Sequence, residues 1–83
     1  MYQYVKTYEI YENSTGVLLV DNLTFEQVAE QAQTYMDFFE TTDISVVCRE
    51  YINNNSIHST TAQLFKHEYI NYFEQLQTMG NLL

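Results

Sequence analysis

The strongest structural signal in this chain is an amphipathic helix predicted from Leu23 to Thr41. Thr24 and Gln27 have the T-x-x-Q spacing of a capping box, in which each side chain bonds to the other residue's backbone N–H. Leu23 and Val28 stand where a hydrophobic staple closes the first turn. The apolar residues that follow a 3.6-residue period are Phe25, Val28, Ala29, Ala32, Tyr35, Met36 and Phe39. One side of this helix must therefore pack against a core.

The other side of the predicted helix is acidic. Its acidic residues are Glu26, Glu30, Asp37 and Glu40, and no Lys or Arg occurs between residues 23 and 42. Glu26 and Glu30 are spaced i,i+4, where two like charges destabilise a helix by roughly 0.2–0.5 kcal/mol. Glu40 and Asp43 fall at the helix C-terminus, where the helix dipole disfavours negative charge. Local helix stability therefore does not explain the acidity, which indicates either solubility or a basic partner.

Three strands and a second helix are predicted around the central helix. In chain order they are a strand over Tyr2–Glu12, a turn at Asn13–Gly16, a strand over Val17–Val20, the central helix, a strand over Ile44–Ile52, a polar loop over Asn53–Ser59 and a helix from Ser59 or Thr60 to Gly80. Alternation puts Tyr4 and Tyr8 on one side of the first strand. Ile44, Val46 and Cys48 of the third strand are predicted to face the helices.

The order ββαβα predicts one α+β domain over residues 1–83. Its simplest form is a three-stranded, mainly antiparallel sheet with two helices packed on one face. If the third strand pairs with the first, it runs parallel to the second. The other sheet face is then open in a monomer. We expect the tyrosines of the first strand, with Tyr51 of the third, to form an aromatic interaction surface there.

The charge of the chain limits its partners. Eleven acidic residues stand against three basic ones, Lys6, Arg49 and Lys66, and the net charge is −8. Residues 1–43 carry eight of the acids and one base. Direct binding of nucleic acid needs a basic footprint, which this chain lacks, and an anionic membrane surface is excluded for the same reason. A basic protein surface, including one that normally holds DNA or RNA, is compatible with the charge.

No pattern of catalytic, cofactor or metal-binding residues is found. Cys48, His58, His67 and Glu68 lack the paired spacing of zinc ligands, and Gly16 and Gly80 stand alone, so no phosphate-binding loop is predicted. Cys48 lies in an apolar strand, where a reduced, buried thiol is expected rather than a nucleophile. The first residues show no basic segment followed by an apolar one, and no apolar run is long enough to span a membrane. We therefore expect a non-enzymatic, cytoplasmic protein without a cofactor.

In size, acidity, Tyr and Asn content and lack of catalytic motif, the chain resembles small inhibitors encoded by phages and mobile elements. Anti-CRISPR proteins and other DNA mimics are the nearest class. The resemblance covers composition along the whole chain, and it implies a protein that occupies the DNA or RNA site of a bacterial host's defence enzyme. The predicted partner-binding residues are Glu26, Glu30, Asp37, Glu40, Asp43, Asp21, Tyr4, Tyr8 and Tyr51. One alternative is a small homodimeric regulatory or structural module that uses the tyrosine-rich sheet face. Another is a small enzyme or ligand-binding protein, which a deep pocket containing His58 or His67 would favour.

Overall fold

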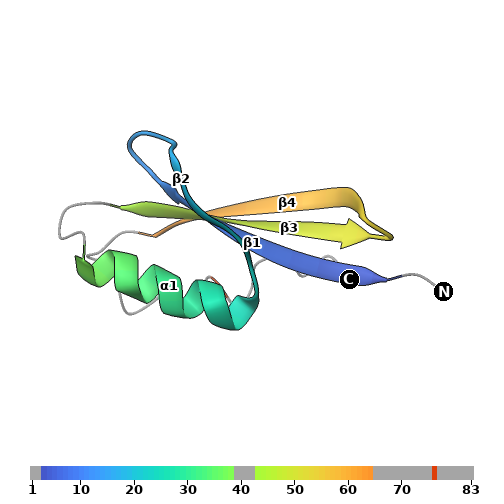
Figure 1. The fold of residues 1–83 in the computed structure, drawn as a ribbon. Coiled ribbons are helices and arrows are strands. Elements are labelled where there is room, and N and C mark those ends of the chain that lie inside the picture. Colours follow the sequence, from blue (N-terminus) through green and yellow to red (C-terminus); the bar gives the residue numbers. More distant parts are fainter. Residues whose placement is uncertain (1–2, 39–42, 65–75, 77–83) are drawn as a thin grey trace.

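A four-stranded antiparallel sheet with a helix on one face forms the described part of the chain (Figure 1). The structure is a computed structural model and describes residues 3–38, 43–64 and Leu76. The elements are β1 (Tyr4–Glu12), β2 (Leu18–Leu23), α1 (Phe25–Phe38), β3 (Ile44–Ile52) and β4 (Asn55–Leu64). The strands lie in the order β2-β1-β3-β4. The α+β character agrees with the sequence, but the prediction of three strands and two helices is wrong.

The first hairpin forms where the turn cluster predicted it. Gly16 adopts a positive φ of 73°, and its N–H donates to the carbonyl of Glu12 at 2.8 Å. The Glu12 N–H donates to the Val17 carbonyl at 2.9 Å, and the Glu12 carboxylate accepts from the Thr15 hydroxyl at 2.8 Å. The left-handed conformation suits glycine, which has no Cβ to clash. The chain therefore reverses at Asn13–Gly16 and returns as β2.

The second hairpin corrects the prediction for residues 53–64. Asn53 and Asn54 have φ values of 51° and 69°, as the two central residues of a type I′ turn require. Ile52 then pairs with Asn55, and β4 continues along β3 to the pair of Leu64 with Ile44. The predictions of a loop over Asn53–Ser59 and of a helix starting at Ser59 or Thr60 are therefore wrong. Asparagine tolerates positive φ, so Asn53 and Asn54 close a hairpin and the chain continues as a strand. The rest of the predicted second helix lies outside the described residues, apart from Leu76, which is buried.

The central helix begins at Phe25, directly after the predicted cap residue Thr24, whereas Leu23 ends β2, which extends beyond the predicted Val17–Val20 strand. The Thr24 N–H donates to Gln27 Oε1 at 2.9 Å, and the Gln27 N–H donates to Thr24 Oγ1 at 3.2 Å, so both halves of the capping box form. Val28, Ala32 and Met36 are fully buried. They pack on the sheet with the other members of the core: Tyr8, Ile10, Leu23, Ile44, Val46, Cys48, Leu64 and Leu76. Phe25 and Tyr35 of the predicted stripe pack against this core, and Phe39 lies outside the described residues. The predicted burial of Ile44, Val46 and Cys48 is confirmed.

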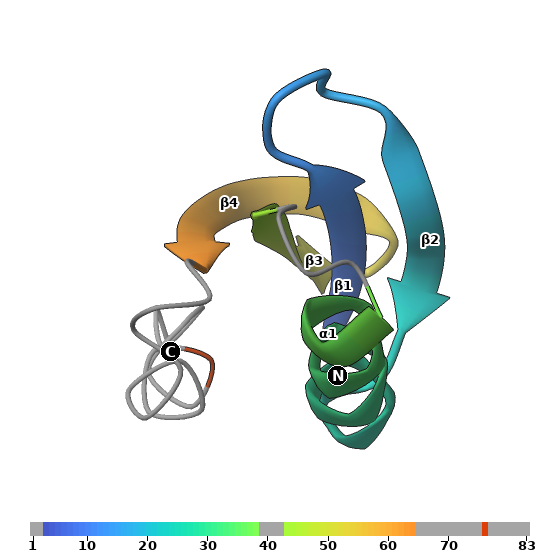
Figure 2. The same cartoon turned by 90° about the vertical axis from the view of Figure 1, so that its left-hand side faces the viewer.

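The pairing of β1 with both β2 and β3 defines two faces of the sheet. Since β1 is antiparallel to each of them, β2 and β3 run parallel to one another and are joined through α1. We call the side that packs on α1 the inner face and the opposite side the outer face (Figure 2). No described helix or strand covers the outer face. The inner face holds the core beneath α1. It also holds a group of polar side chains, which lies past the N-terminal end of the helix.

Candidate partner-binding surface and buried polar cluster

Three of the predicted partner-binding residues form one row on α1. Glu26, Glu30 and Asp37 are exposed on the side of the helix away from the sheet. At 3.6 residues per turn they lie within about 40° of one another around the helix axis. At 1.5 Å per residue, Glu30 lies about 6 Å and Asp37 about 17 Å along the axis from Glu26. We call these three residues the acidic stripe.

A local contact orients the far end of the acidic stripe. Gln33 Nε2 donates to the Asp37 carboxylate, at Oδ2, over 3.1 Å. The apolar side of the helix is fixed in the core, so the carboxylates cannot turn toward the sheet without unpacking α1. The stripe is therefore a preformed acidic surface.

The remaining acidic residues of the prediction are dispersed. Asp21 is exposed on β2, at the sheet edge near the start of α1. Asp43 is half-buried next to β3, and its carbonyl accepts the Asn13 N–H at 3.0 Å. Glu40 lies outside the described residues. Glu26, Glu30 and Asp37 thus form the row, while Asp21 and Asp43 lie on other segments.

The predicted tyrosine surface is split between the two faces of the sheet. Tyr4 and Tyr8 lie opposite Ile52 and Cys48 of β3, and side chains directly opposite each other share a face. Tyr8 is 3% exposed and belongs to the core on the inner face. Tyr51 lies opposite Val5, on the outer face. The expectation that these tyrosines share an open face is wrong. Alternation separates Tyr4 and Tyr8 from Val5, and the register pairs Tyr51 with Val5.

A buried carboxylate marks the inner face beyond the core. The Glu50 side chain is 0% exposed, and the Tyr4 hydroxyl donates a hydrogen bond to Glu50 Oε2. His58 Nδ1 lies 3.0 Å from Glu50 Oε1, a geometry in which the carboxylate accepts from the Nδ1–H. The His58 side chain is 45% exposed. Three strands therefore each supply one member of a polar cluster: Tyr4 from β1, Glu50 from β3 and His58 from β4.

This cluster was absent from the sequence prediction, although one signal for it exists. Glu50 has the same parity as Ile44, Val46 and Cys48, which were predicted to face the helices. Period-2 alternation therefore carries Glu50 to the buried face. Its partner His58 was assigned to a loop, so nothing indicated that a donor would stand opposite Glu50. The strand register brings the two together, because Glu50 pairs directly with His58.

Tyr8 and Cys48 connect the polar cluster to the core. Burial raises the pKa of the Cys48 thiol, and a hydrogen bond with the Tyr8 side chain and the charge of Lys6 oppose this shift. Burial, together with the neighbouring Cys48, raises the pKa of the Tyr8 hydroxyl. Both groups therefore stay protonated at neutral pH. This environment is the reverse of one that activates a nucleophilic thiolate.

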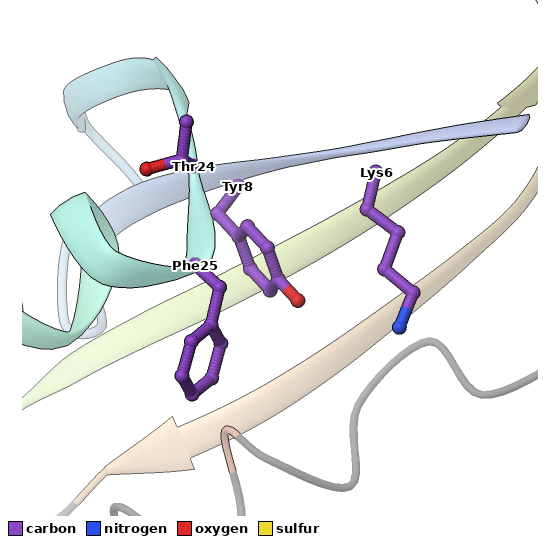
Figure 3. A pocket seen from close by; sticks show the side chains of 4 residues that line it. All are labelled: Lys6, Tyr8, Thr24 and Phe25. Carbon is purple, nitrogen blue, oxygen red and sulfur yellow. The ribbon is translucent and has the colours of Figure 1, made fainter.

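A hollow opens beside this region, between β1 and the start of α1 (Figure 3). It has a volume of about 540 Å³ and is lined by Lys6, Tyr8, Thr24 and Phe25. The Tyr8 and Phe25 rings meet edge to face, with centroids 6.1 Å apart and planes inclined by 65°. This contact joins the first turn of α1 to β1. The described lining of the hollow thus combines the ammonium group of Lys6, the hydroxyls of Thr24 and Tyr8, and the rings of Tyr8 and Phe25.

The accessibility of Cys48 gives a direct test of this packing. A thiol-specific disulfide reagent such as DTNB is expected to modify the folded protein at about pH 8 at least ~100-fold more slowly than the denatured protein. The reason is that Cys48 is fully buried and its thiol is protonated. Because Cys48 is the only cysteine, the absorbance change reports on this site alone. A Ser14→Cys variant adds an exposed thiol and should show one fast and one slow phase. Rapid labelling of the folded wild type would contradict the buried position.

The outer face carries a separate ionic group. Arg49 Nε lies 3.1 Å from Glu9 Oε1, and the Tyr11 hydroxyl donates to the same oxygen at 2.8 Å. Next to them, Val5, Thr7, Asn22, Tyr51 and Asn54 line a shallow hollow of about 270 Å³. Arg49 is thus already paired with an acid of its own chain. The outer face combines polar and aromatic groups without a row of like charges.

Among the described residues, no three His, Cys, Asp or Glu side chains are grouped to hold a metal ion, and no helix is long and apolar enough to cross a membrane. His67 and Glu68, two of the metal ligands considered above, lie outside the described residues. Comparison with protein families, curated proteins and solved structures gave no match. Function must therefore be inferred from the geometry of the chain itself.

Proposed function

We propose that this protein is a non-enzymatic inhibitor that uses the acidic stripe to bind the basic, nucleic-acid-binding surface of a bacterial host protein. The observation that carries the proposal is the exposed row of Glu26, Glu30 and Asp37 on a helix whose other side is fixed in the core. A defence enzyme of the anti-CRISPR target type is the expected partner. The protein would act by occupying the surface that otherwise holds phosphates.

The charge distribution supports this mode of binding. From Leu18 to Phe38 the chain contains no Lys or Arg, so β2 and α1 themselves contribute acidic side chains and no basic ones. Complementary potentials steer association and are weakened by salt, because mobile ions screen exposed charges within about 8–10 Å. We therefore expect fast, salt-sensitive binding to a basic cleft.

Charge reversal on the stripe tests the proposal. The variant Glu30→Lys/Asp37→Lys should fold normally and bind its partner about tenfold or more weakly, because two attractive contacts become repulsive. The partner is first captured from a lysate of a low-GC bacterium at low salt, released at high salt and identified. The Kd is then measured with the purified partner at two salt concentrations and in competition with duplex DNA. Partner binding and DNA binding should exclude each other.

A charge-matched pair of variants serves as the control. Glu30→Gln/Asp37→Asn and Gln3→Lys/Val17→Lys each change the net charge of −8 by two units, but only the first alters the stripe. Gln3 and Val17 are exposed and lie outside α1. The first variant should weaken binding more than the second. Equal effects would show that net charge alone matters, and an unchanged Kd for Glu30→Lys/Asp37→Lys would reject the acidic-stripe mechanism.

A homodimeric interaction module is the second candidate function. The outer face favours it, since Val5 and Tyr51 border a hollow there and no described element covers them. Because Tyr4 and Tyr8 lie on the inner face, the outer face has Tyr11 and Tyr51 as its tyrosines among the described residues. It is therefore less aromatic than expected. Recovery of the protein only as a salt-resistant dimer, with no basic partner, would favour this candidate over inhibition.

A further inference from the structure

The two edges of the sheet differ in how they are protected against pairing with another strand. β2 has six residues, carries the charged Asp21, and contains Asn22 with a φ of 56°. Its register with β1 is also irregular at two places. Short length, charge and irregular backbone are features that prevent an edge strand from accepting a further strand. The β2 edge is therefore protected.

The β4 edge is longer and carries no Asp, Glu, Lys or Arg, and its register with β3 is irregular at one place, between Ser56 and His58. It has ten residues, Asn55–Leu64, and also contains no Pro or Gly. Residues 55–59, Thr61 and Gln63 are exposed, including Ile57 at 41%. From Ser59 to Leu64 it pairs with β3 residue by residue, so this half of the strand is regular. In an antiparallel edge strand, alternate residues direct their N–H and C=O groups away from the neighbouring strand.

We propose that β4 is a self-association edge, on which the β4 strand of a second copy of this chain pairs antiparallel to extend the sheet. A strand that pairs antiparallel with its own copy supplies both halves of a two-fold interface, so no other sequence is required. Charge favours this location: two copies of net charge −8 repel each other, and β4 is a long edge strand that contributes no acidic side chain. This inference is independent of the proposed function.

The pairing would place both acidic stripes on one side of the assembly. Residues directly opposite each other in an antiparallel pair share a face, so both α1 helices would cover the same face of the eight-stranded sheet. In each copy α1 packs mainly on β1, which is two strands away from β4. With strands about 4.8 Å apart, the two helices would lie about 24 Å apart across the sheet. The dimer would thus carry two rows of carboxylates on one side, inclined to each other by the twist of the sheet.

The oligomeric state of the full chain tests the proposal. Sedimentation equilibrium of the wild type should show a concentration-dependent dimer, with a Kd below roughly 500 μM. Ser59→Lys/Thr61→Lys should raise that Kd about tenfold or more, because the added charges meet across the two-fold axis. The matched control, Val17→Lys/Leu18→Lys, adds the same charge at the exposed start of the other edge strand and should leave the Kd unchanged. A monomeric wild type, or a dimer that both variants affect equally, would overturn the proposal.

Amide hydrogen exchange identifies which surface forms the contact. In the wild-type dimer, amides of β4 that point away from β3 should exchange slowly, and they should exchange fast in Ser59→Lys/Thr61→Lys. A dimer formed through the outer face would leave these amides fast in both proteins, which would also overturn the assignment to the β4 edge. Far-UV circular dichroism of each variant confirms that the fold is kept.

Discussion

Replacing Ile10 by alanine is expected to lower the free energy of unfolding by about 2–5 kcal/mol. Ile10 is fully buried at the centre of β1, where it pairs with Val46 of β3 and Val20 of β2. Removing three carbon atoms there loses the transfer energy of the side chain and leaves a cavity that the surrounding strands cannot fill. A domain of this size is stabilised by only about 0.05–0.15 kcal/mol per residue. The loss would therefore be a large part of the total.

Leu18→Ala is the matched control for this substitution. It also removes three carbon atoms from a strand, but Leu18 is 45% exposed. Its expected effect is about 1 kcal/mol or less. The free energy of unfolding of both variants is measured by urea denaturation, followed by circular dichroism. The midpoints are compared after checking that the m-value, the dependence of this free energy on urea concentration, is unchanged. Similar losses for the two variants would contradict the placement of Ile10 beneath α1.

Replacing Tyr4 by phenylalanine is expected to lower stability by about 1.5–3 kcal/mol, the range for a hydrogen bond to a charged group. The Tyr4 hydroxyl donates to Glu50, whose side chain is completely buried. Phenylalanine keeps the ring but removes this donor from a carboxylate that bulk water does not reach. Each buried side-chain nitrogen or oxygen of the described residues has a hydrogen-bond partner, so this variant would break a satisfied network.

Tyr11→Phe is the control on the opposite face. Its hydroxyl also donates to a carboxylate, that of Glu9, but this side chain is 18% exposed and also pairs with Arg49. Its loss should be about 1 kcal/mol or less, because water and Arg49 still solvate the carboxylate. In a Glu50→Gln background the effect of Tyr4→Phe should also shrink, since the charge is gone. An undiminished effect in that background would show that Tyr4 acts through packing instead.

The same contact gives the Tyr4 substitution a pH signature. Burial, together with the hydrogen bond to Glu50, raises the pKa of Tyr4 from 10.0 to about 12. The folded state thus holds this proton more tightly than the unfolded state, and the resulting stability is complete below pH 10 and is lost as the pH rises through about 12. The difference in stability between the wild type and Tyr4→Phe should therefore be smaller at about pH 11 than at about pH 9. A constant difference would contradict the shift.

Much of the first half of the fold could be predicted because its signals are local. The capping box of Thr24 and Gln27, the 3.6-residue stripe and the turn at Gly16 each depend on residues a few positions apart. For the same reason the exposure of Glu26, Glu30 and Asp37 followed from the burial of the opposite side of the helix. The third strand was also predicted with its observed bounds, since Ile44–Ile52 alternates and is rich in β-branched residues.

The second half depended on non-local contacts that sequence patterns do not report. Residues 55–64 are polar and include Thr60 and Gln63 at the spacing of a capping box. This local pattern favours the start of a helix over a strand. Pairing with β3 decides in favour of the strand, because hydrogen bonds along its length satisfy the backbone and the Asn53–Asn54 turn fixes the register. Thr60 and Gln63 then lie on opposite faces of the sheet.

The sequence by itself determined the helix, its acidic stripe and the core beneath it, because periodicity and charge are properties of neighbouring residues. Tertiary structure alone decided that Tyr8 is buried while Tyr51 lies on the outer face, and that Glu50 meets Tyr4 and His58. It also made β4, rather than a helix, the edge strand next to β3. The physical reason is register: a shift of one residue between strands moves every side chain to the other face, and only the pairing of distant strands sets it.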